Sequence, residues 1–211
     1  MDTPLAPLPA ADDLTALLGS RICHDLISPL GAIGNGVELL SLSGAAAGPE
    51  IALITQSAQN ANARIRFFRL AFGAASEGHE VGAAEIQSIL GDLNQGGRLA
   101  VDWQAQPPHR RADVRMAFLA ILCLECALPY GGRITVAGDG DRWTLTAASD
   151  RIRTDPQLWQ RLGGPPADRP PAPPLSPAHV QFALLAQAAA ARGRALWLDH
   201  GDKAVTLGFQ G

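Results

Sequence analysis

Lysine, cysteine and long apolar runs are all scarce in this sequence, and each shortage excludes a class of protein. Lys203 is the only lysine among 211 residues, so lysine chemistry has one candidate, near the C-terminus. Three cysteines are too few for a disulfide framework and suit a reducing compartment. The longest unbroken apolar run, 116–124, is far shorter than the ~18 residues that span a bilayer. The first residues lack the basic and apolar regions of a signal peptide, so we expect a soluble, cytoplasmic protein.

Charge of either sign is modest as well. The chain carries 17 basic and 20 acidic side chains, which gives a formal net charge of −3. Binding to nucleic acid needs clustered cations, so this balance argues against it. Hydrophobic residues make up 47% of the chain, which is enough to bury a core in one large domain or two small ones.

Residues 1–75 are expected to form a helical hairpin. Acidic residues open a helix over 12–42, and Pro49 with Glu50 opens a second over 49–73. Residues at steps of three or four give the second helix one apolar face: Ile51, Ile54, Ala58, Ala61, Ile65, Phe68 and Phe72. The short connection predicts that the helices are antiparallel. Because two helices cannot enclose a core alone, we expect a homodimer in which two hairpins form a four-helix bundle.

Residues 83–211 alternate helices with short strands and predict a second, α+β domain. Helices are expected over 83–93, 113–128 and 178–191, and strands over 98–103, 133–137, 142–147, 195–198 and 204–209. This order favours an α/β sandwich in which a mixed sheet is covered on one face. The proline-rich segment 165–177 is interpreted as a surface loop, with a polyproline ligand as the alternative.

The most informative stretch lies in the middle of the first expected helix. At about 100° per residue, one stripe collects the apolar residues Ile22, Leu26, Leu30, Ile33, Val37 and Leu40. His24 lies almost opposite this stripe, on the side that also carries Ser20, Ser28 and Asn35. Its imidazole should therefore project from the polar face of the helix.

Three neighbours of His24 suggest chemistry at this position. Asp25 could accept a hydrogen bond from one ring nitrogen and leave the other free as a nucleophile. Arg21, one turn earlier, could neutralise the charge of a transferred phosphoryl group. Pro29 costs ~3 kcal/mol inside a helix, so its presence one turn after His24 indicates that the local backbone geometry matters there.

The run His-Asp-Leu-Ile-Ser-Pro-Leu at 24–30 resembles the H-box of two-component histidine kinases. Together with 21–23 and with Arg-Leu-Ala-Phe-Gly at 69–73, it is more specifically similar to the ChpT-type histidine phosphotransferases of alphaproteobacteria. The resemblance implies that His24 is the phospho-accepting residue, Asp25 its orienting and acid–base helper, and Pro29 the H-box proline. It also implies that partner proteins contact Arg21, Ser28, Pro29 and Arg69.

The resemblance further implies the partners of such a protein. The phosphoryl donor would be the receiver domain of a hybrid histidine kinase, and the acceptor a response regulator of the cell cycle. We expect no cofactor or metal ion of the chain's own, because Mg²⁺ belongs to the partner receiver domain. Neither nucleic acid nor a membrane is an expected partner.

The second half resembles a histidine-kinase catalytic domain of the Bergerat ATPase type that has lost its nucleotide site. Leu122 and Cys126 stand where such kinases carry Mg-ATP-binding asparagines, and the segment 148–153 contains no glycine. Backbone amides need glycines to approach phosphates closely, so no ATP binding is expected. The alternatives are a diverged but active histidine kinase, which would need nucleotide, and a non-catalytic dimeric adaptor that only holds receiver domains.

Several other residues allow a functional and a structural interpretation. Cys123 and Cys126 form a C-x-x-C pair, but a zinc site needs about four ligands, so we expect buried thiols. Arg64 and Arg66 either line a docking surface near His24 or are solvated helix residues. The remaining histidines are expected to be solvated: His79, His109, His179 and His200.

Overall fold

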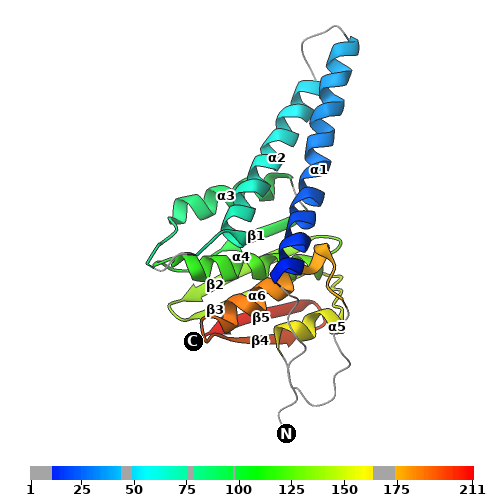
Figure 1. The fold of residues 1–211 in the computed structure, drawn as a ribbon. Coiled ribbons are helices and arrows are strands. Elements are labelled where there is room, and N and C mark those ends of the chain that lie inside the picture. The colour runs from blue at the N-terminus through cyan, green and yellow to red at the C-terminus, as the bar shows by residue number, and fades with distance from the viewer. Residues whose placement is uncertain (1–10, 44–48, 76–77, 97, 164–173) are drawn as a thin grey trace.

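The computed structural model describes residues 11–43, 49–75, 78–96, 98–163 and 174–211 of the chain. Its first two helices, α1 (Ala11–Ser43) and α2 (Pro49–Phe72), lie side by side as a long hairpin. The hairpin rises from a compact α/β part, with most of its length projecting away from the sheet (Figure 1). Gly36 is buried where the helices approach, since a Cβ atom there would lie 2.5 Å from the Ile54 side chain.

The remaining elements build one sheet and the helices that cover it. In chain order they are α3 (Ala83–Gly96), β1 (Leu99–Trp103), α4 (Arg111–Cys126), β2 (Gly132–Asp139), β3 (Arg142–Ala148), α5 (Pro156–Trp159), α6 (Val180–Ala190), β4 (Ala195–His200) and β5 (Ala204–Gln210). Short 3₁₀ turns, η1 (Gln160–Leu162) and η2 (Pro177–His179), follow α5 and precede α6. The strand order is β1-β2-β3-β5-β4, with β1 parallel to β2 and the other pairs antiparallel.

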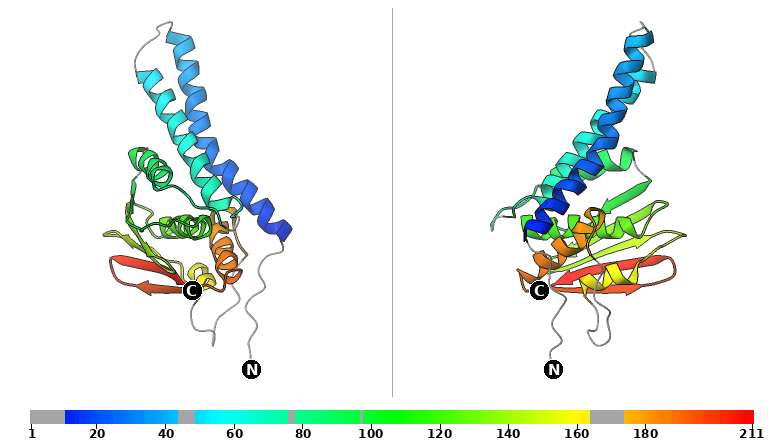
Figure 2. Two further views of the ribbon diagram at one scale, coloured as in Figure 1. Left: turned by 90° about the vertical axis from the view of Figure 1, so that its left-hand side faces the viewer. Right: turned by 45° about the vertical axis from the view of Figure 1, so that its right-hand side comes forward.

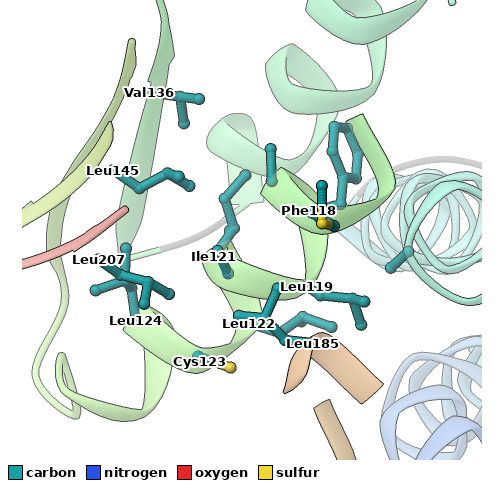
Figure 3. Packing of buried hydrophobic residues seen from close by; sticks show 14 of the residues in the cluster. Phe118, Leu119, Ile121, Leu122, Cys123, Leu124, Val136, Leu145, Leu185 and Leu207 are labelled. Carbon is teal, nitrogen blue, oxygen red and sulfur yellow. The ribbon is translucent and has the colours of Figure 1, made fainter. Parts of the chain in front are cut away.

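In the described part of the chain, the helices that pack on this sheet lie on one of its faces. Along the central strands β2 and β3, buried residues alternate with more exposed ones, as a period of two requires. The inward side chains include Val136, Leu145 and Leu207, which point toward α4 (Figure 3). The left-hand view in Figure 2 shows α4 and α6 on the same side of the sheet. The predicted sandwich with a mixed sheet covered on one face is confirmed.

The base of the hairpin belongs to the same core as the sheet. Phe67 and Phe68 of α2 are buried, and the Phe67 ring lies 4.6 Å from that of Phe118 on α4, measured between centroids. The last carbonyl groups of α2 accept hydrogen bonds from arginines of α4, with Arg111 donating to Leu70 and to Arg69. A helix leaves its final carbonyls unpaired, so these bonds fix the end of α2 on the α/β part.

The beginning of α1 packs against α6 of the α/β part. Leu14 forms a small apolar cluster with Val180 and Ala183 of α6, and Leu17 and Leu18 pack against it. Both helices of the hairpin are therefore attached to the α/β part, α1 through α6 and α2 through α3 and α4.

The helices and strands expected from the sequence all occur, with ends that differ by a few residues. The single-turn elements α5, η1 and η2 were not predicted, because elements of three or four residues have no periodicity to detect. The prediction that His109 is solvated is wrong. Its ring is 3% exposed, and its Nε2 lies 3.0 Å from the Ala105 carbonyl oxygen and 3.4 Å from Trp103 Nε1. The expected loop over 165–177 lies largely outside the described residues.

The apolar face predicted for α2 is only partly buried. Ala61 and Phe68 are buried as expected, whereas Ile51 and Ile65 are 44% and 53% exposed. The buried positions Ala63, Phe67 and Leu70 lie off the predicted face, because the lower half of α2 packs against α3 and α4 as well as α1. Within the described residues, no helix is long and apolar enough to cross a membrane.

Candidate functional site

His24 is presented to solvent where the hairpin leaves the α/β part. Its side chain is 85% exposed, nearly two turns beyond the segment of α1 that packs on α6. The residues expected on the same face of α1, Ser20, Ser28 and Asn35, are exposed too. The predicted polar face of the helix is confirmed, and the imidazole is open to a large reaction partner.

Asp25 holds one nitrogen of the His24 ring. Its Oδ1 lies 3.1 Å from His24 Nδ1, and its side chain is only 10% exposed. A carboxylate can only accept hydrogen bonds, so Nδ1 must be the donor. In the neutral ring the proton then resides on Nδ1, and Nε2 keeps its lone pair for a nucleophilic reaction.

Two arginines lie against the other oxygen of Asp25. Arg21 Nε donates to Oδ2 at 2.8 Å, and Arg64 of α2 brings its NH1 to 3.8 Å from the same atom. The carboxylate is thus held between a ring on one oxygen and two guanidinium groups on the other. Such charge-assisted bonds are short and directional, so they fix the rotamer of Asp25.

The side chain of Arg21 points toward η2 of the α/β part rather than toward solvent. Its side chain is 12% exposed, and its NH1 donates to the Ala178 carbonyl oxygen of η2 at 2.6 Å. Burial and the positive charge of Arg21 lower the pKa of His179, which lies in the same turn. The structure therefore joins Arg21 to Asp25 and to η2, whereas the predicted contact of Arg21 with a transferred phosphoryl group stays a prediction.

The other predicted partner contacts are dispersed along the hairpin. Ser28 is exposed and Pro29 half-buried, both within two turns of His24. Arg69 is 70% exposed but lies in the last turn of α2, at the base of the hairpin, where it pairs with Glu85 of α3 at 2.8 Å. Arg66 also pairs with α3, through Asp92 at 2.9 Å, so only Arg64 of the three arginines of α2 reaches the environment of His24.

A cavity near the site was not found from the sequence. It measures about 310 Å³ and lies where α2, α3, β1 and α4 meet. Its lining includes Arg64, Phe68, Asn94, Arg98 and Glu125. These residues come from three helices and from the position before β1, and they share no motif, so no sequence signal pointed to the cavity.

The positions compared with nucleotide-binding asparagines lie at a packed contact. Leu122 is 3% exposed, and its carbonyl oxygen lies 3.4 Å from Gln181 Nε2 of α6. Cys126 Sγ lies 3.3 Å from the same nitrogen. Apolar side chains and a glutamine thus occupy this contact between α4 and α6. In the part of the chain that the structure describes, no three histidine, cysteine or acidic side chains gather as a metal site.

The three cysteines differ sharply in their environments, which predicts their reactivity. Burial raises the pKa of the Cys123 thiol well above its usual value and raises that of Cys126 to about 11, whereas Cys23 is exposed. Because the thiolate is the reactive form, a raised pKa leaves almost none of it at neutral pH. At pH 8 we expect a thiol reagent to label one cysteine per folded chain rapidly and all three in denaturant. Rapid labelling of a C23S variant would contradict this.

Comparisons with known proteins agree on one family. The Histidine phosphotransferase C-terminal domain family matches residues 83–204. The protein phosphotransferase ChpT of Brucella abortus (strain 2308) is 36% identical over 167 residues, which cover 76% of this chain and 79% of that protein. A solved structure described as a bacterial phosphotransferase superimposes with a TM-score of 0.80 at 30% identity, over 98% of this chain and 100% of that one.

Proposed function

Because this chain belongs to the histidine phosphotransferase family, we propose that His24 is the residue that carries the phosphoryl group. The donor is the phosphorylated aspartate of a hybrid histidine kinase's receiver domain, and the acceptor is the aspartate of a response regulator. The observation that carries this proposal is the pairing of an 85% exposed His24 with a nearly buried Asp25, 3.1 Å apart. By the resemblance carried by 21–30 and 69–73, the response regulators are proteins of cell-cycle control.

The chemistry requires little more than a positioned nucleophile. The Nε2 lone pair of His24 attacks phosphorus, an N–P bond forms, and the P–O bond to the aspartyl oxygen breaks, its electron pair staying on the carboxylate. The ring becomes positively charged and keeps its proton on Nδ1, beside Asp25 Oδ1. Asp25 stabilises this charge electrostatically, as a buried carboxylate does for an imidazolium. Transfer to the next aspartate reverses these steps.

The partner receiver domain supplies the remaining parts. It brings the acyl phosphate and, by the resemblance, the Mg²⁺ that neutralises its oxygens, so this chain needs no cofactor of its own. The exposed face of α1 around His24 offers Ser28 and Pro29 for docking. Arg69 is a contact for a receiver only if the docked domain also reaches the base of α2, where that arginine pairs with Glu85.

The hairpin also carries the surface of a homodimer. Among the described residues, all but one of the large exposed apolar side chains lie on the hairpin: Ile27, Leu30, Val37, Leu39, Ile51, Leu53 and Ile65. The exception is Tyr130. Monomeric proteins rarely expose this many large apolar side chains on one pair of helices. A second hairpin packed on this surface would complete a four-helix bundle and bury it.

Charge placed on the apolar hairpin surface should separate the dimer. Leu30 is 58% exposed and Val37 50%, two turns apart on α1. In the double variant L30E/V37E, two carboxylates per chain would have to be desolvated at the interface, so we expect a monomer. Sedimentation equilibrium measures the mass, and S20E serves as a control that adds charge to the polar face. A wild-type chain that sediments as a monomer would refute the dimer.

A further inference from the structure

A chain of polar contacts runs from His24 into the interior of the α/β part. His24 bonds to Asp25, Asp25 to Arg21, and Arg21 to the carbonyl of Ala178, with distances of 3.1, 2.8 and 2.6 Å. The same carbonyl accepts a second bond from Gln181 Nε2 at 3.0 Å. Gln181 is fully buried, so the series of polar contacts that begins at His24 ends in the core.

The geometry at Arg21 makes it a rigid connection. One edge of the planar guanidinium, Nε, points to Asp25, while NH1 points to a residue 157 positions away. A planar group that donates from two fixed positions to two partners has its orientation determined by both. With 12% exposure, water has little access to compete for either bond. The position of Asp25 is therefore set jointly by α1 and by η2.

From these contacts we infer that Arg21 is a positioning residue: through Asp25, the α/β part holds the His24 ring in the tautomer and orientation that react. This inference rests on the proposed function of His24. It gives the α/β part a task that needs no nucleotide, namely to act as a fixed support for the reacting helix. Arg64, 3.8 Å from Asp25, balances charge but makes no such bridge between the two parts.

The variants R21A and R21K separate a bridge from a simple positive charge. Lysine keeps the positive charge and most of the aliphatic side chain. Its single ammonium group, however, cannot donate in the two fixed directions in which the planar guanidinium donates to Asp25 and to Ala178. We expect the rate of phosphoryl transfer at saturating receiver to fall about 100-fold in R21A and about 10-fold in R21K, the scale of a misplaced reacting group. The receiver concentration for half-maximal rate should change less than about threefold, because the Arg21 side chain is only 12% exposed and directed inward.

A spectroscopic readout distinguishes positioning from loss of structure. Nitrogen-15 chemical shifts of the His24 ring, assigned by their absence in H24Q, report which nitrogen carries the proton. The wild type should show Nδ1–H, and both Arg21 variants should show a mixture of tautomers. R66A is the matched control, because Arg66 also joins the hairpin to the α/β part, through Asp92 and Ser88, but lies away from Asp25. It should leave the rate and the tautomer unchanged.

Each outcome bears on one proposal. Wild-type rates and an unchanged tautomer in R21A and R21K overturn the inference while leaving His24 as the acceptor. An impaired R21A with a fully active R21K also overturns it, since charge alone would then suffice. If R21A does not fold, R21K decides in the same way. Failure of the wild-type chain to accept any phosphoryl group would instead overturn the proposed function.

Discussion

Replacement of His24 by glutamine should lower phosphoryl acceptance by about 10³-fold or more, as expected when a nucleophile is removed. An amide nitrogen has no available lone pair, whereas Nε2 of the neutral imidazole does. The side chain is 85% exposed, and among the described residues only Asp25 lies in hydrogen-bond contact with its ring. The substitution therefore removes the reacting atom while leaving the fold intact.

The assay uses a receiver domain labelled with phosphorus-32 on its aspartate, mixed with the chain, and follows acid-labile label on the chain. His79 is exposed and distant in sequence, so H79Q is the matched control and should accept label like the wild type. Label on H24Q equal to that on the wild type would refute the assignment. Self-labelling from ATP alone would favour a diverged kinase, and receiver binding without any label on the wild type would favour an adaptor.

The exposed position of His24 could be predicted from the sequence because it depends on local geometry. A helix fixes the directions of residues three and four apart, so the polar face that carries His24 and Ser28 followed from spacing alone. The bond between Asp25 and the adjacent ring followed in the same way. What could not be predicted was the inward course of Arg21, since its partner lies 157 residues further along the chain.

For the fold as well, features set by neighbouring residues could be predicted from the sequence, whereas contacts between distant residues could not. Alternating apolar residues predicted the strands of the sheet, and their buried side faces α4 as expected. On α2, periodicity alone could not tell which residues of the apolar face are buried in the folded chain and which stay exposed, as Ile51 and Ile65 do. His109 was misjudged for a related reason, because Trp103 and the Ala105 carbonyl enclose it only in the folded chain.

Asp25→Asn should slow phosphoryl transfer by about 10² to 10⁴-fold, even though it changes only an oxygen to an amide nitrogen. Arg21 donates to Oδ2 and can only be satisfied by an oxygen there, so the amide must place its NH₂ at the Oδ1 position, against His24 Nδ1. Nδ1 then has to accept, and the ring proton moves to Nε2, the atom that attacks. An analogous change of tautomer in a serine-protease triad costs about 10⁴-fold.

The matched control is Asp25→Glu, which keeps a charged acceptor near Nδ1. It should retain transfer within about tenfold, because the additional rotatable bond of glutamate partly offsets the shift of its carboxylate. Both variants are assayed with the same labelled receiver, and ring nitrogen shifts report the tautomer. An Asp25→Asn variant with Nδ1–H and normal transfer would show that the carboxylate does not orient the ring. Slow transfer with Nδ1–H retained would assign Asp25 to charge stabilisation alone, because the ring would then be correctly protonated and only the imidazolium would lack its counter-charge.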